Sequence, residues 1–91
     1  MDKSYDWNPD KNRTLQAERG ISFEEIQYAI ENGDLITVKD HYNLKKYPNQ
    51  RIYYINIRNY VYMVPFVEDE KKIFLKTIIP SHKANKKYNL I

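Results

Sequence analysis

The sequence predicts an α+β fold in which two N-terminal helices pack on one face of an antiparallel sheet of about four strands, followed by a short C-terminal helix. Helix-capping residues and apolar side chains at helical spacing occupy the first third of the chain. After Gly33 the apolar side chains alternate with a period of two, which is typical of strands. The length of 91 residues supports one hydrophobic core, so we expect a single domain over residues 1–91.

The first helix is predicted over residues 9–19. Asn8 can accept hydrogen bonds from the free amides of the first turn, and Pro9 suits the first helical position because no amide partner is needed there. Gly20 then provides a residue that can adopt the left-handed conformation and end the helix.

The second helix is predicted over residues 22–32. Ser22 and Glu25 have the spacing of a capping box, and Asn32 followed by Gly33 suits the end of the helix. The apolar face of this helix comprises Phe23, Ile26, Ala29 and Ile30.

Four strands follow, separated by polar turn residues. They are predicted over residues 35–38, 51–57, 60–67 and 72–79. A long polar loop occupies residues 39–50, and Arg58 with Asn59 forms a two-residue hairpin connection, because asparagine tolerates a positive φ. Ser81 can cap a short, lysine-rich helix over residues 82–88.

Pairing the strands as a meander sorts their side chains into two faces. The face expected to pack under the helices carries Tyr53, Ile55, Ile57, Tyr60, Tyr62, Val64, Phe66, Ile73, Leu75 and Ile79. The second face is expected to be half open, so that a ligand can lie on it, and carries Ile52, Tyr54, Asn56, Val61, Met63, Pro65, Phe74, Lys76 and Ile78. The core is expected to include Trp7, Leu15, Phe23, Ile26, Ile30, Ile55, Tyr62, Val64 and Leu75.

Charge is distributed unevenly along the chain. Residues 1–34 contain eight acids and four bases, for a net charge of −4, and residues 35–70 contain five bases and four acids, for +1. Residues 71–91 contain six lysines and no acid, for +6. This basic C-terminal segment attracts phosphate groups, although a solvated lysine tail is an equally good explanation of the charge alone.

Composition excludes several functional classes. The absence of cysteine rules out disulfides and thiolate chemistry, and favours a cytoplasmic protein. His41 and His82 lack the spacing of a metal site, and Gly20 and Gly33 alone make no phosphate-binding loop. Charged residues make up 30% of the chain and interrupt every apolar run, so no membrane span is expected. We therefore expect no metal, no other cofactor and no membrane partner.

The chemistry that remains is RNA cleavage without a metal. The 2′-hydroxyl of RNA is itself the nucleophile, so the protein must supply a base, an acid and cations around the phosphate. The candidate catalytic residues are His82 for proton transfer, and Lys83, Lys76 and Arg58 for phosphate charge. The candidate RNA-binding residues are the aromatic Tyr54 and Phe74, and the basic Lys86 and Lys87. Each also has a structural explanation, as a surface histidine, packed strand aromatics or solubilising lysines.

Three segments resemble the landmarks of BrnT-type toxins in order and spacing. They are Tyr5-Asp6-Trp7-Asn8-Pro9-Asp10-Lys11-Asn12, Glu18-Arg19-Gly20-Ile21-Ser22-Phe23-Glu24-Glu25 and Ile78-Ile79-Pro80-Ser81-His82-Lys83-Ala84. The resemblance covers nearly the whole chain. It implies a RelE-like fold and a ribonuclease that arrests translation. It also implies a small cognate antitoxin with a DNA-binding region, so that operator DNA is bound only through the toxin–antitoxin complex.

The last of these motifs is matched only in part. Lys83 carries over from the family motif, and His82 stands where that motif has an arginine. Thr77 and Glu68 stand where the family usually has arginines on the last strands. The resemblance therefore implies either catalysis with His82 in a changed role or a weakened activity.

Two functions remain open from the sequence. The leading one is an endoribonuclease toxin, and the alternative is a non-catalytic module that binds nucleic acid or protein through its basic patch. For the toxin, we expect the antitoxin to place acidic side chains over residues 71–91 and to cover the second sheet face. The acidic surface of residues 1–34 is the other candidate docking site.

Overall fold

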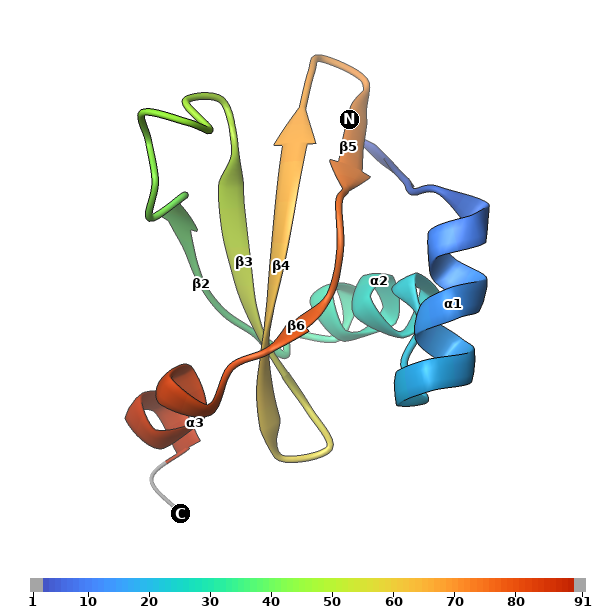
Figure 1. Ribbon diagram of the computed structural model, residues 1–91, viewed down its shortest axis with the longest axis vertical. Coiled ribbons are helices and arrows are strands. Elements are labelled where there is room, and N and C mark those ends of the chain that lie inside the picture. The colour runs from blue at the N-terminus through green and yellow to red at the C-terminus, as the bar shows by residue number, and fades with distance from the viewer. Residues whose placement is uncertain (1–2, 90–91) are drawn as a thin grey trace.

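The computed structural model describes residues 3–89, and the side chains of residues 3–88. This part of the chain has an α+β arrangement, which confirms the predicted fold class (Figure 1). Its helices are α1 (Pro9–Arg19), α2 (Phe23–Glu31) and α3 (His82–Asn89). Its strands are β1 (Ser4–Asp6), β2 (Leu35–Asp40), β3 (Arg51–Ile57), β4 (Tyr60–Glu68), β5 (Lys72–Leu75) and β6 (Ile79–Pro80). The sheet order is β1-β5-β4-β3-β2, with β6 paired to β4.

The predicted N-terminal caps hold the first two helices. The side chain of Asn8 accepts hydrogen bonds from the amides of Asp10 and Lys11, at 2.8 and 3.1 Å. Gly20 ends α1 with a φ of 66°, and the Ser22 hydroxyl accepts from the Glu25 amide at 3.2 Å. Both helices therefore begin and end within one residue of their predicted bounds.

The predicted hairpin between β3 and β4 is also confirmed. Arg58 and Asn59 have φ values of 51° and 63°, which place both residues in the left-handed region. This geometry matches the right-handed twist of the flanking strands. The antiparallel register that follows begins with Ile57 opposite Tyr60.

The prediction of about four strands was too low, because the described sheet contains six. β1 was missed, and it pairs in parallel with β5, placing Tyr5 opposite Ile73. A three-residue edge strand is too short to show a period of two. Its pairing also joins residues nearly seventy positions apart, which no local pattern reveals.

The prediction of one continuous strand over residues 72–79 was wrong. Phe66 pairs with Leu75 and Met63 pairs with Ile79. Residues 64–65 of β4 therefore lie opposite residues 76–78, so the adjoining segment has one residue more than β4. Pro65 lies at this break and has no amide hydrogen to donate, while its carbonyl accepts from the Lys76 amide at 2.8 Å.

The extra residue reverses the alternation of side chains beyond the break. Ile78, expected on the second face, is fully buried in the core, whereas Ile79, expected in the core, is half-buried. These two positions are therefore exchanged relative to the prediction.

The hydrophobic core lies between the first sheet face and the two N-terminal helices. Six of the nine predicted core residues are buried, and Trp7, Ile30 and Tyr62 pack against them as partly buried side chains. Beside this core, Asn12 joins α1 to α2, since its carbonyl accepts from the Phe23 amide at 2.8 Å and its amide donates to Glu24 at 2.7 Å.

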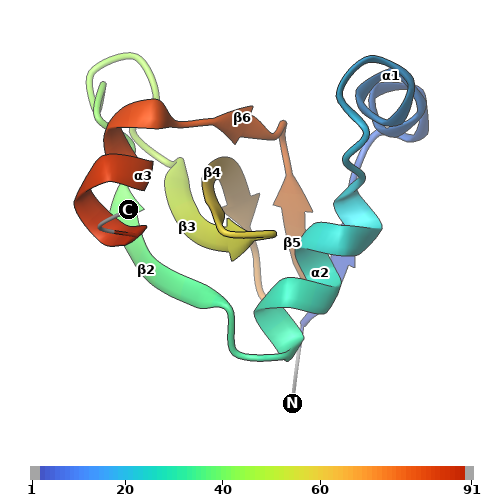
Figure 2. The same cartoon turned by 90° about the horizontal axis from the view of Figure 1, so that it is seen from below.

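The third helix packs on the opposite side of the sheet. Figure 2 shows α2 and α3 on opposite sides of the β3–β4 hairpin. Ala84 of α3 is buried, as are Ile52 and Val61, whose side chains belong to the second face. The second face is thus partly covered by the C-terminal helix.

Candidate functional site

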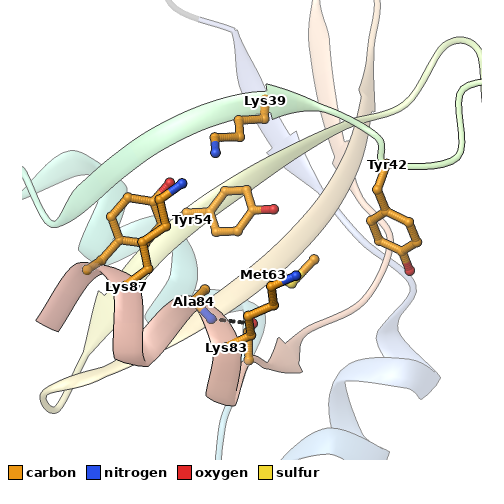
Figure 3. Close-up of a pocket in the computed structure, with 9 residues that line it drawn as sticks. Lys39, Tyr42, Tyr54, Met63, Lys83, Ala84 and Lys87 are labelled. Carbon is orange, nitrogen blue, oxygen red and sulfur yellow. Dashed lines mark hydrogen bonds between the residues drawn. The ribbon is translucent and has the colours of Figure 1, made fainter. Parts of the chain in front are cut away.

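A cavity of about 350 Å³ lies between α3 and the second sheet face (Figure 3). It is built from four separate segments, namely β2, the loop after β2, the β3–β4 hairpin strands and the C-terminal helix α3 with Ser81 before it. Its lining residues are Lys39, Tyr42, Tyr54, Met63, Ser81, Lys83, Ala84, Lys87 and Tyr88.

Hydrogen bonds to Val61 on β4 fix the start of α3 beside this cavity. The Val61 carbonyl accepts from the Ser81 amide at 3.0 Å, and the Val61 amide donates to the Asn85 side chain at 3.2 Å. The Ser81 hydroxyl caps the helix by accepting from the Ala84 amide at 3.1 Å. Because the helix is anchored at its first turn, its backbone is held at a defined place beside the sheet.

Cations and aromatic rings alternate around the cavity. The Lys39 ammonium lies 5.6 Å from the centre of the Tyr54 ring and 5.8 Å from that of Tyr88. The Lys87 ammonium lies 5.3 Å from the Tyr88 ring centre, and the two tyrosine rings are 5.9 Å apart. Three lysines and no carboxylate occur among the lining residues in the described part of the chain, so the cavity favours an anion.

Lys39 and Tyr88 shift each other's ionisation. A side-chain hydrogen bond with Lys39 lowers the pKa of the Tyr88 phenol. The same hydrogen bond raises the pKa of Lys39, which keeps that ammonium charged. The pair therefore offers a fixed positive charge and a phenol that releases its proton more readily than an ordinary tyrosine.

Three of the residues predicted from the sequence meet in this cavity: Tyr54, Lys83 and Lys87. His82 and Lys86 are exposed on α3 and do not line it. Two further predicted residues, Phe74 and Lys76, form a separate pair at β5, with the Lys76 ammonium 5.5 Å from the Phe74 ring centre.

Arg58 lies apart from the other predicted residues. One of its guanidinium nitrogens lies 2.5 Å from a carboxylate oxygen of Glu25, and another donates to the Gly20 carbonyl at 3.3 Å. These contacts hold Arg58 against the start of α2, and it is not among the residues that line the cavity.

The sequence did not predict that Lys39, Tyr42 and Tyr88 contribute to the site. The predicted strand ends at Val38, so Lys39 falls in the predicted loop, yet its pairing with Ile52 places it on the second face. Tyr42 follows β2 in an irregular segment with no period. Tyr88 was within the predicted helix, and its position four residues after Ala84 is the signal that places both on one helix face.

Glu68, noted above as a departure from the pattern that the resemblance implies, lies in a different part of the molecule. Its carboxylate lies 2.8 Å from the Lys3 ammonium and 3.4 Å from the Arg51 guanidinium. The acid therefore links the end of β4 to the start of β3 and to the residue before β1, and it does not line the cavity.

Two further properties of the described residues bear on the class of site. Within residues 3–88, no three histidine, cysteine, aspartate or glutamate side chains are grouped so that they could hold a metal ion. Among the helices that the structure describes, none has the length and apolarity needed to cross a bilayer.

The α+β fold and the cationic, tyrosine-lined cavity together define a small protein with a site suited to an anionic ligand. A family model, "Ribonuclease toxin, BrnT, of type II toxin-antitoxin system", matches residues 7–87. The chain belongs to this family, and it is a ribonuclease toxin of a type II toxin–antitoxin system. No curated protein and no solved structure matches the chain. Family membership implies an RNA substrate and a cognate antitoxin.

Proposed function

We propose that this toxin is a metal-independent endoribonuclease whose RNA substrate binds in the cavity under α3. The observation that supports this proposal most directly is the grouping of Lys39, Lys83 and Lys87 around Tyr54 and Tyr88. Three ammonium groups can neutralise a phosphate and its transition state, and the rings can hold a base beside it.

The proposed reaction is a transesterification within the RNA. The 2′-oxygen attacks the adjacent phosphorus, the bond from phosphorus to the 5′-oxygen breaks, and the products are a 2′,3′-cyclic phosphate and a 5′-hydroxyl. The 2′-hydroxyl proton passes to a base on the protein, and a proton must reach the departing 5′-oxygen. The lysine ammonium groups stabilise the negative charge that builds on the phosphate oxygens.

Tyr88 is the first candidate for the proton transfer. It lines the cavity, and its hydrogen bond with Lys39 lowers its pKa. His82 is the second candidate, since an imidazole can both accept and donate a proton and the backbone of His82 adjoins Lys83 at the start of α3. Its side chain is exposed and does not line the cavity, so Tyr88 is placed first.

The remaining predicted residues have supporting roles in this proposal. Tyr54 stacks on a base within the cavity. Lys86 on the exposed side of α3, and the Phe74–Lys76 pair at β5, extend the basic and aromatic surface along which the strand of RNA runs. Arg58 can attract RNA only at a distance, because it is paired with Glu25.

The biological consequence follows from cleavage. Cutting messenger RNA in the cytoplasm arrests translation, and the cognate antitoxin prevents this by covering the cavity. Operator DNA is contacted only through the antitoxin in the complex. Charge complementarity with the basic C-terminal segment supports this arrangement.

Cleavage of a single-stranded RNA oligomer by the purified chain tests the proposal. We expect cutting to persist in excess EDTA and to disappear when every ribose is replaced by 2′-deoxyribose. Lys83→Ala is expected to slow cleavage about 100- to 1,000-fold and to relieve growth arrest, and His82→Ala measures the contribution of the imidazole. A wild-type protein that binds this RNA without ever cutting it would support the non-catalytic binding module instead.

A further inference from the structure

The loop that follows β2 presents an aromatic side chain at the edge of the cavity. Tyr42 is 75% exposed, although it lines the cavity. In Figure 3, Tyr42 lies on one side of Met63 and Tyr54 lies on the other, and Lys83 extends from α3 toward the space between them. Two aromatic rings thus flank a cation within a single site.

The position of Tyr42 is held by a buried histidine. His41 is only 6% exposed, and its ring centre lies 4.4 Å from that of Tyr42 and 4.5 Å from that of Tyr47. Its Nδ1 accepts a hydrogen bond from the Asn43 amide at 3.0 Å, and its own amide donates to the Gln50 carbonyl at 3.1 Å. These contacts close the base of the loop, so Tyr42 is exposed but supported.

We propose that Tyr42 is a second base-binding platform, which stacks on the base of an unpaired nucleotide next to the one held by Tyr54. The inference rests on the proposed function in that it takes RNA as the ligand. His41 is the positioning residue for this platform, because it supports the ring without lining the cavity.

The chemistry of the surface favours a nucleotide strand over other ligands. Two rings separated by a cation reproduce the order base, phosphate, base along one strand. Every base has a π-face, so a platform of this kind tolerates many sequences but requires bases that are not already stacked in a duplex. The ligand class is therefore single-stranded RNA, with at least two adjacent unpaired nucleotides in the site.

Binding of an RNA that cannot be cut tests this subsite separately from catalysis. The probe is a fluorescein-labelled, single-stranded 2′-O-methyl RNA octamer of mixed sequence, and the readout is its dissociation constant from fluorescence anisotropy. We expect Tyr42→Ala to weaken binding about tenfold and Tyr42→Phe to retain it, since stacking needs the ring and not the hydroxyl. Tyr28→Ala is the matched control, because Tyr28 is an exposed tyrosine on α2 and does not line this cavity.

An abasic scan of the octamer then assigns the contact. Removing the base at one position of the octamer should weaken its binding to the wild type by the same factor as Tyr42→Ala weakens binding of the intact octamer. The Tyr42→Ala variant should then bind the intact octamer and this abasic octamer with equal affinity. Annealing the complementary strand should remove the difference between wild type and Tyr42→Ala.

His41 variants test the positioning role. His41→Ala should weaken binding as Tyr42→Ala does, and His41→Asn, which keeps an acceptor for the Asn43 amide, should recover part of the loss. Circular dichroism melting identifies any variant that fails to fold. Because Tyr42 is exposed, its own variants keep the test decisive even if both His41 variants unfold.

The outcomes separate this inference from the proposed function. Equal affinity of Tyr42→Ala and wild type for the octamer overturns the subsite, whether or not the unmodified RNA is cut. Loss of antitoxin binding in Tyr42→Ala without loss of RNA binding also overturns it, and assigns Tyr42 to the protein interface. Absence of cleavage with Tyr42-dependent binding overturns only the catalytic proposal.

Discussion

Lys39 on β2 and Tyr88 on α3 form a pair across the cavity, with the ammonium 5.8 Å from the centre of the phenol ring. The two residues are 49 positions apart in the sequence, and they meet because α3 packs back onto the second sheet face. Their hydrogen bond lowers the pKa of Tyr88 and raises that of Lys39. The pKa of Tyr88, the proposed proton carrier, is thus shifted by a residue from the opposite side of the site.

This pair predicts a change in the pH dependence of cleavage. If the Tyr88 phenolate accepts the 2′-hydroxyl proton, activity rises with pH through the lowered pKa of Tyr88. Lys39→Met removes the hydrogen bond, so the pKa of Tyr88 returns toward its ordinary value and the rising limb moves to higher pH. The measurement is a pH–rate profile for wild type, Lys39→Met and Tyr88→Phe. An unchanged rising limb in Tyr88→Phe would assign the proton transfer to another group.

The buried side chain of Asn12 should contribute to stability. Asn12→Ala leaves the Phe23 amide without its acceptor, which should lower the free energy of unfolding by about 1–3 kcal/mol. Urea unfolding measures this loss. Asn12 also donates to Glu24, and this hydrogen bond is the main cause of the lowered pKa of Glu24.

The Glu24 shift makes part of this stability depend on pH. Because the folded-state pKa is lowered, the contribution of Glu24 is present above its ordinary value of 4.5 and is lost as pH falls through the folded-state value. Asn12→Ala should therefore show a smaller loss of stability than wild type when the pH is lowered across that range. Parallel pH–stability curves for the two proteins would contradict this explanation.

The break between β5 and β6 predicts different costs for two adjacent isoleucines. Ile78→Ala should lower the free energy of unfolding by about 2–5 kcal/mol, because Ile78 is fully buried in the core. Ile79→Ala should cost clearly less, since Ile79 is only half-buried. Urea unfolding of the two variants compares them directly. A larger loss of unfolding free energy in Ile79→Ala than in Ile78→Ala would contradict the break and favour the uninterrupted strand that the sequence pattern predicted.

The antitoxin interface can be located by charge reversal. Changing Lys83, Lys86 and Lys87 together to glutamate should slow association with the antitoxin and flatten the dependence of the rate on salt. The control reverses Lys45 and Lys46, two exposed lysines that belong to neither residues 1–34 nor residues 71–91. Stopped-flow association rates at several salt concentrations provide the readout. Unchanged kinetics in the α3 variant would move the interface to the acidic surface of residues 1–34.

The elements that the sequence predicted well depend on local chemistry. Asn8, Gly20 and Ser22 determine the ends of α1 and α2 through contacts within a few residues, and Arg58 with Asn59 makes the β3–β4 turn in the same way. A pattern read along the chain contains all of this information.

The rest depends on contacts between distant segments. β1 exists only because Tyr5 lies beside Ile73, and the exchange of Ile78 and Ile79 follows from an interruption opposite Pro65. The cavity likewise requires α3 to be anchored at Val61. Lys83 could be proposed from its basic surroundings, but its neighbours across the cavity became visible only in the folded chain.

The most direct test of the cavity as the catalytic site compares two lysines on one helix. Lys83 lines the cavity, whereas Lys86, three residues later, is exposed outside it. The measurement is the single-turnover rate of cleavage of a single-stranded RNA in EDTA, with wild type, Lys83→Ala and Lys86→Ala. We expect Lys83→Ala to lower the rate about 100- to 1,000-fold and Lys86→Ala to change it only a few-fold. Equal losses in the two variants, or no loss in Lys83→Ala, would contradict the assignment of catalysis to this cavity.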